Sequence, residues 1–306
     1  MPWRHRAPCA RMRAGGCATW RSATPSMRSG ASWTNRSFSR SENVALWNRL
    51  RRLFGVKPKV AVAEKRALSI LTYHHHLPLE LKERSCFRDG TVTNTVESFE
   101  QQMAWLRDNG YATMKLAELE DYMKGVEMEV SRKLMITFDD GHLSVARYCY
   151  DILKRHGFTA VVFLITGKQP ELPVEVLDPD VLQYVSRQEM VAQSDVYEWA
   201  AHTHRMHARD EQLVSRLVSS QPAVLREDAA KCRAALGGTE HFCFPFGQYN
   251  PRVIDTLVEV GYRYFYSTED GLAYPDPGHD VHVLRRLNVS PRLTVEQFGR
   301  LMARTR

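Results

Sequence analysis

From residue 67 onward, short apolar runs rich in β-branched residues alternate with amphipathic helical segments. Clear runs occupy residues 67–73, 134–138 and 159–165, and the alternation continues to residue 303. Strands that alternate with helices in this way favour parallel pairing, because each helix returns the chain to the start of the next strand. Roughly seven such units without an internal repeat predict one α/β barrel of TIM-like size rather than two domains.

The run at 134–138 ends in Asp139, Asp140 and Gly141. A buried strand that ends this way delivers two adjacent carboxylates to the edge of a core. They repel each other unless solvent, a cation or a shared proton compensates them. An isolated Asp-Asp-Gly is also typical of a turn or a helix N-cap, so the pair alone leaves a metal site and a solvated turn both open.

Three histidines follow a later predicted strand at 196–201, namely His202, His204 and His207. Neutral imidazoles bind divalent cations, and His with Asp is a common zinc ligand set. Such turns are often merely solvated. Because function in parallel barrels lies at the carboxyl ends of the strands, the histidines and the Asp pair are expected at the same end, and together they favour a metal site.

The net charge of +7 belongs to the first part of the chain. Residues 1–60 carry thirteen Arg and Lys against the single acid Glu42, whereas residues 61–306 carry 29 basic and 34 acidic residues. Residues 61–306 therefore give no polybasic argument for nucleic-acid binding. The six cysteines have no CxxC or zinc-ribbon spacing, which predicts free thiols.

Residues 1–60 are expected to form a basic, disordered or transit-peptide-like leader. Within it, residues 45–55 predict a short basic amphipathic helix that either touches anionic lipid or is a solvated lead-in. No continuous apolar segment of a secretory signal is visible, and a later translation start is a further alternative. Residues 61–306 are expected to form the folded domain that contains the candidate site.

Three motifs occur in the order Thr137–Gly141, His202–His207 and Phe244–Gly247. In this order they resemble the motifs of the polysaccharide deacetylase (NodB homology) family, over about residues 67–304. The resemblance implies a distorted, incomplete (β/α) barrel of about seven strands. It also implies removal of N-acetyl groups from amino sugars with a metal, usually Zn²⁺, although another divalent transition metal would serve.

Departures from the family pattern indicate which branch of the family the chain resembles. His202 and His207 are five residues apart rather than four, and Cys243 stands where most members have Arg. The segment after Leu284 has no His in the place where many members carry the general acid, whereas Tyr73-His74 matches a pair on the first strand of the biofilm branch. The chain therefore most resembles poly-β-1,6-N-acetylglucosamine N-deacetylases.

The resemblance implies a role for each matching residue. Asp140, His202 and His207 are expected to bind the metal and to leave open positions for water and the acetamide oxygen. Asp139 is expected to be the general base.

The other catalytic candidates come from separate segments. The backbone N–H of Phe246 is expected to stabilise the oxyanion, and His74 is expected to protonate the departing amine, with His282 as the alternative acid. Arg286 is expected to orient or charge-balance Asp139. Candidate substrate-binding residues are Pro245, Gly247 and Tyr249.

The expected function is a metal-dependent hydrolase that deacetylates an N-acetylglucosamine-containing exopolysaccharide. The alternatives are a deacetylase of peptidoglycan or of a small N-acyl sugar, and a non-catalytic glycan-binding module. The expected partner is an N-acetylated glycan. The family resemblance predicts an extracytoplasmic or cell-surface location, although the sequence shows no signal peptide.

Overall fold

The computed structural model describes residues 67–303. The predicted leader at 1–60, including the segment 45–55, lies outside these residues, so its helix and its lipid contact stay predictions. Within the described part, no helix is long and apolar enough to cross a membrane. Its four cysteines are free thiols, as the sequence predicted.

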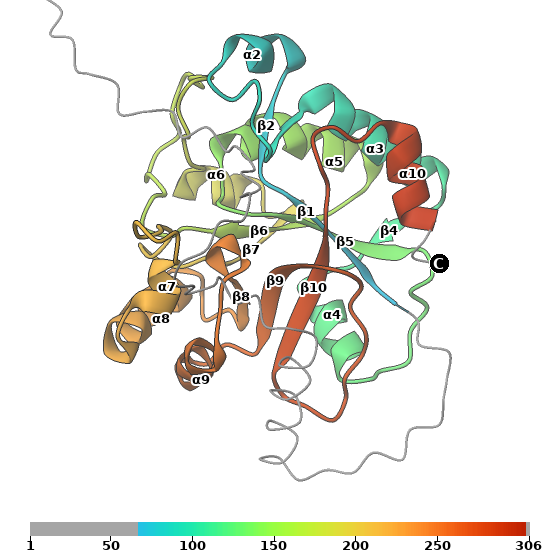
Figure 1. The fold of residues 1–306 in the computed structure, drawn as a ribbon. Coiled ribbons are helices and arrows are strands. Elements are labelled where there is room, and N and C mark those ends of the chain that lie inside the picture. The colour runs from blue at the N-terminus through green and yellow to red at the C-terminus, as the bar shows by residue number, and fades with distance from the viewer. Residues whose placement is uncertain (1–66, 304–306) are drawn as a thin grey trace, which may run out of the picture.

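Seven parallel strands close into a barrel (Figure 1). They are β1 (Ser69–Tyr73), β5 (Lys133–Phe138), β6 (Ala160–Leu164), β7 (Tyr197–Ala201), β8 (His241–Cys243), β9 (Tyr264–Asp270) and β10 (His282–Asn288). The ring closes because β1 pairs with β10 on one side and with β5 on the other. This confirms the predicted (β/α) barrel, which is incomplete in that it has one strand fewer than the eight of a TIM barrel.

The short strand β4 (Ala112–Thr113) distorts this ring. It pairs with the first two residues of β5, whereas β6 pairs with the last two, Thr137 and Phe138. The side chains of Thr113 and Thr159 are hydrogen-bonded at 3.0 Å across the gap. β4 therefore separates β5 from β6 at the end of the barrel where the strands begin.

Helices surround the barrel, and Figure 1 shows α3, α5 and α10 together on one side and α8 and α9 on another. The longer helices are α3 (Val96–Asp108), α4 (Leu116–Met123), α5 (Tyr150–His156), α8 (Pro222–Ala235), α9 (Pro251–Val260) and α10 (Val295–Ala303). Shorter ones are α2 (Leu79–Arg84), α6 (Arg187–Ala192) and α7 (Arg216–Ser219). Caps define several ends: the Asn250 side chain accepts from Val253 N at the start of α9, and Gly261 ends that helix with φ +108°.

Alternate residues of β5 face two different environments, as the period of a strand requires. Leu134, Ile136 and Phe138 pack outward under α3 and α5. Met135 instead joins an inner cluster that also contains Tyr122 of α4. The inner cluster fills the barrel, and α4 closes the end where the strands begin. The same alternation turns Asp139, the residue after β5, toward the interior.

One expectation from the sequence, a polar loop from His74 to about residue 95, was wrong. The segment after His74 is not a simple loop to residue 95, since it contains α2 and two paired strands, β2 (His75–Leu77) and β3 (Thr93–Thr95). His75 and His76 are consequently buried strand residues, not loop residues. The helical segment after His142 begins at Leu143 and passes through a π-helical turn at Val145–Cys149 into α5.

Candidate active site

Asp139 lies inside the barrel and is 2% exposed. Arg286 reaches it from β10 in a bidentate pair, with Nη1–Oδ1 at 2.7 Å and Nη2–Oδ2 at 2.8 Å. Burial raises the pKa of Asp139, but the Arg286 guanidinium outweighs burial and holds that pKa well below its usual range. Arg286 is itself fully buried, so each of these charges depends on the other.

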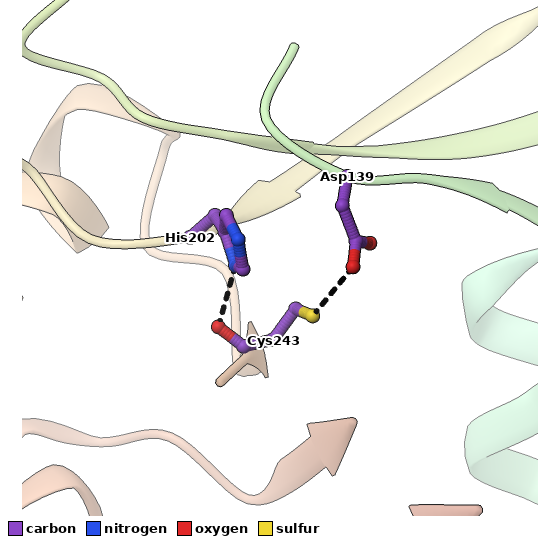
Figure 2. A group of neighbouring side chains, drawn as sticks. All are labelled: Asp139, His202 and Cys243. Atoms are coloured by element: carbon purple, nitrogen blue, oxygen red, sulfur yellow. Dashed lines mark hydrogen bonds between the residues drawn. The ribbon is translucent and has the colours of Figure 1, made fainter. Parts of the chain in front are cut away.

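Cys243, at the end of β8, connects Asp139 to the first histidine (Figure 2). Its Sγ lies 3.5 Å from Asp139 Oδ2, and its backbone oxygen accepts a 2.7 Å hydrogen bond from His202 Nδ1. Asp139, His202 and Cys243 are close enough to form a metal-ligand group. Arg286 already serves as the cation there, because its Nη2 also contacts Sγ at 3.1 Å. Burial raises the pKa of the Cys243 thiol, which further disfavours a thiolate ligand.

A second candidate ligand group consists of Asp140, His202 and His207. Asp140 Oδ1 lies 3.1 Å from His207 Nε2 and 3.4 Å from His202 Nε2, and it is buried without a hydrogen-bond partner. In a neutral His202 ring, the hydrogen bond from Nδ1 leaves the lone pair on Nε2 facing Asp140. Two acceptors that face each other need a cation or a proton between them, so these residues fit a divalent metal.

The pKa directions agree with this reading of the second group. Burial disfavours the charged form of His202, but the neighbouring Cys243 and Asp140 outweigh burial and raise its pKa well above the usual value. Burial likewise raises the pKa of Asp140, yet the surrounding histidines hold it well below its usual range. Without metal, a proton therefore balances the carboxylate.

His142 contacts the same carboxylate and was not predicted from the sequence. Its Nε2 lies 3.2 Å from Asp140 Oδ2, the oxygen that faces away from the other two histidines. A signal was available, because His142 follows Gly141 directly in the Asp-Asp-Gly motif.

The two candidate acids lie at opposite ends of the barrel. His74 Nε2 is 3.7 Å from Asp139 Oδ2, and its side chain is 24% exposed. Burial lowers the pKa of His74 in spite of the nearby carboxylates. His282 is the first residue of β10 and stacks on Tyr264 at 5.2 Å, where the strands begin. The structure thus brings His74, and not His282, to Asp139. His204 contacts the Thr166 side chain at 3.0 Å.

The turn Pro245–Gly247 follows β8 beside His207. Phe246 has φ +59°. Its ring centre lies 4.4 Å from that of His207, and the Arg209 guanidinium lies 4.0 Å from the centre of the Phe246 ring. Gly247 also has a positive φ, and a Cβ there would overlap Thr268 Oγ1. Only glycine therefore fits at this position without displacing the turn.

Tyr249 lies beyond this turn. Its ring stacks on Phe244 at 4.5 Å and its hydroxyl donates to Glu269 at 2.9 Å. Phe244 therefore covers one of its faces. Tyr264 and Tyr266 are buried core residues.

Backbone strain concentrates around these side chains. Among the described residues, the non-glycine positions with positive φ are Asp140, Thr203, Leu213 and Phe246. Asp140, Thr203 and Phe246 are themselves members of the three motifs or lie within them. Such residues cost about 1–3 kcal/mol each and persist where the surrounding structure holds them for function.

Comparison with known proteins bears on this site. A family model described as "Polysaccharide deacetylase" matches residues 129–265, the span that contains the Asp pair, the histidines and the Pro245 turn. Over these residues the chain is similar to the polysaccharide deacetylase family. A poly-beta-1,6-N-acetyl-D-glucosamine N-deacetylase of Staphylococcus aureus (strain MRSA252) is 27% identical over 198 residues, covering 62% of this chain and 65% of the relative. YxkH of Bacillus subtilis (strain 168) is 27% identical over 207 residues, covering 66% and 68%.

Solved structures share the fold of this chain. IcaB from Ammonifex degensii superposes with a TM-score of 0.64 at 24% identity, covering 78% of this chain and 97% of that one. The Streptococcus pyogenes deacetylase PplD, solved with acetate, gives a TM-score of 0.64 at 20% identity, covering 78% and 99%. These similarities extend over the whole barrel.

Proposed function

We propose that this chain is a metal-dependent hydrolase that removes N-acetyl groups from a polymer of N-acetylglucosamine. The observation that carries the proposal is the convergence of Asp140 Oδ1, His202 Nε2 and His207 Nε2 on one point. Three protein ligands leave positions for water and substrate, which is the pattern of a catalytic site. When bound there, a divalent ion such as Zn²⁺ supplies Lewis acidity toward a carbonyl and toward water.

Asp139 is the proposed general base. Its pKa is held low by Arg286, so it is ionised at neutral pH and can accept a proton from the attacking water. Arg286 fixes both carboxylate oxygens and thereby sets the direction in which the base faces. The same guanidinium balances the charge of Asp139 before the proton arrives.

His74 is the proposed general acid. Because burial lowers its pKa, His74 is neutral at neutral pH, and the proton it delivers has to be collected during the reaction. Asp139 lies 3.7 Å away and can pass on the proton taken from water. The proton balance then closes: hydrolysis of the amide gives acetic acid and an amine, which at neutral pH become acetate and an ammonium group, and His74 returns to its neutral form.

The turn after β8 is proposed to stabilise the oxyanion through the backbone N–H of Phe246. The positive φ of Phe246 and the lack of room for a Cβ at Gly247 set the orientation of the peptide groups here. A preorganised N–H donor of this kind is worth about 3–4 kcal/mol in a transition state. Pro245, Gly247 and Tyr249 are proposed to line the adjoining substrate surface.

The substrate class rests on relatives. The Staphylococcus aureus relative is named for deacetylation of poly-beta-1,6-N-acetyl-D-glucosamine, and the five-residue spacing of His202 and His207 fits the same branch. We therefore propose a glycan of this kind as substrate. Peptidoglycan and small N-acyl sugars are the competing substrates in the test.

The test combines metal content with deacetylation on the full chain. Elemental analysis would count the zinc bound per chain, and acetate release would be assayed on N-acetylglucosamine oligomers with and without a chelator. About one metal per chain with chelator-sensitive acetate release is the expected result. Release from peptidoglycan fragments alone would change the substrate, and metal without any release would favour a binding module.

A further inference from the structure

The carboxylate of Asp140 makes contacts on both of its oxygens. Oδ1 faces His202 and His207, the proposed metal ligands, whereas Oδ2 faces His142 Nε2 at 3.2 Å. His142 is not part of either candidate ligand group in the described chain. It therefore contacts Asp140 from the side opposite the proposed metal.

Burial and ring packing hold His142 in place. The residue is 3% exposed, and its ring lies 5.3 Å from that of His75 at 71° and 5.5 Å from that of Tyr184 at 33°. A donor fixed between two rings holds a ligand carboxylate in one orientation. Such partners commonly govern metal affinity, because an unsupported carboxylate must be ordered when the metal binds.

The long loop at 168–186 supports the same residue from the backbone. Leu143 N donates to Gln183 O at 2.8 Å, and Val185 N donates to Gly141 O at 3.0 Å. These bonds pair the segment after Asp140 with the end of the loop and set Tyr184 against the His142 ring.

The start of the loop is bound to its end by Tyr184. Lys168 Nζ donates to the Tyr184 hydroxyl at 2.7 Å and lies 4.7 Å from the ring centre. The two ends of the loop therefore hold each other next to His142. The 168–186 loop thus has a specific point of contact with the candidate site.

We infer that His142 is a positioning residue that fixes Asp140 for metal binding, and that Tyr184 holds its ring in place. The inference rests on the proposed function, because it requires a metal at Asp140, His202 and His207. The hydrogen bond from His142 Nε2 orients the carboxylate so that Oδ1 faces the two histidines. Loss of that donor leaves Asp140 free to rotate and weakens the site without removing a ligand.

The test measures metal affinity rather than activity. The dissociation constant for Zn²⁺ would be determined by competition with a chromogenic chelator for the full-length wild type, His142→Phe and His142→Gln. Phe keeps the ring packing and removes the donor, whereas Gln keeps an N–H donor at a similar reach. We expect His142→Phe to raise the dissociation constant about 10- to 100-fold and His142→Gln to stay near the wild type.

His241→Phe is the matched control. His241 is also buried and bound to a carboxylate, with Nε2 at 3.1 Å from Glu120, but it begins β8 at the opposite end of the barrel. Its replacement is expected to lower the melting temperature and to leave Zn²⁺ affinity unchanged. Tyr184→Leu keeps the donor and removes the packed ring, so a smaller rise is expected; it also serves if His142→Phe does not fold.

Two results would overturn the inference alone. A wild type that binds Zn²⁺ no more tightly than His142→Phe and Tyr184→Leu would exclude a positioning role. A His142→Gln variant as weak as His142→Phe would show that an N–H donor at this position does not preserve the affinity, which contradicts the role given to the donor. If the wild type itself binds no Zn²⁺, the proposed metal site fails first and the inference falls with it.

Discussion

Buried histidine and carboxylate groups differ in their hydrogen-bond partners at the two ends of the barrel. Where the strands begin, both nitrogens of His241 have partners, Nδ1 with Tyr266 at 2.9 Å and Nε2 with Glu120 at 3.1 Å. Where the strands end, Asp140 Oδ1 has no hydrogen-bond partner and faces two histidine nitrogens.

Backbone conformation and packing also differ between the two ends of the barrel. The strand-start end is closed by α4 and its apolar side chains, whereas Asp140 and Phe246 at the other end have positive φ. The paired His241 and the apolar side chains of α4 favour stability, whereas the unpaired Asp140 oxygen and the strained backbone at the other end are typical of function. The comparison predicts that substitutions at one end change stability and that substitutions at the other change catalysis and metal binding.

The largest expected effect is on turnover in Asp139→Asn. The amide cannot accept the water proton, so we expect kcat to fall about 10²- to 10⁴-fold while the bound metal is retained. Acetate release and elemental analysis measure the two quantities. Glu120→Gln is the control at the opposite end and should keep wild-type kcat. A binding module would lose no function in either variant.

Arg286→Met is expected to produce the next largest effect, on stability. It leaves Asp139 buried without its ion-pair partner, which costs about 3–5 kcal/mol in chemical denaturation at neutral pH. In the wild type the folded pKa of Asp139 is lowered, so its stabilising contribution is present above the ordinary Asp pKa of about 3.9 and lost as pH falls toward the lowered value.

Loss of the Arg286–Asp139 ion pair should also change how the stability of Arg286→Met depends on pH. Without the guanidinium, burial raises the pKa of Asp139, and stability should rise on acidification from neutral pH as the carboxylate becomes neutral. A variant whose stability has the same pH profile as the wild type would contradict the account of this ion pair.

Metal affinity should depend on pH with a defined sign. The pKa of His202 is raised well above its usual value, so at neutral pH a metal must displace a proton from it. Affinity for Zn²⁺ should therefore rise with pH, about tenfold per unit for one displaced proton, until the pKa of His202 is passed. Titrations in buffers of matched ionic strength measure this, and a flat profile would argue against His202 as a ligand.

Gly247→Ala and Gly157→Ala are expected to have the smallest effects. The two glycines share a left-handed backbone conformation, so the variants differ in the space available to the added Cβ. Gly247 has φ +66° and Gly157 has φ +72°, but a Cβ would overlap Thr268 at the first and meets nothing within 4 Å at the second. Gly157→Ala should cost only the left-handed strain, about 1 kcal/mol. Gly247→Ala should cost more and also lower kcat, because it displaces the Phe246 turn. Equal effects would contradict a role for this turn.

Much of the fold was predictable because it depends on local periodicity. The β5 run and the helix at 116–123 follow from apolar spacing, and strand ends in a parallel barrel carry the functional residues. The contact between Arg286 and Asp139 was anticipated because the expected Arg near Pro245 is replaced by Cys243.

Other features depend on long-range contacts that periodicity does not report. The ring of strands closes because β1 pairs with both β5 and β10, and no sequence pattern in β5 or β10 indicates this pairing. β2 has three residues, too few to show a period, and its burial arises from packing against the π-helical turn Val145–Cys149 and against β3. His142 was missed because its role depends on which oxygen of Asp140 it contacts. The roles assigned to the site residues stay predictions.

The most direct test of the central claim is anomalous diffraction at the zinc absorption edge from crystals of the zinc-loaded full chain. The account predicts a single strong peak bounded by Asp140 Oδ1, His202 Nε2 and His207 Nε2, at about 2.0–2.2 Å from each. A peak bounded by Asp139 and Cys243, or no peak at the strand-end face of the barrel, would contradict it.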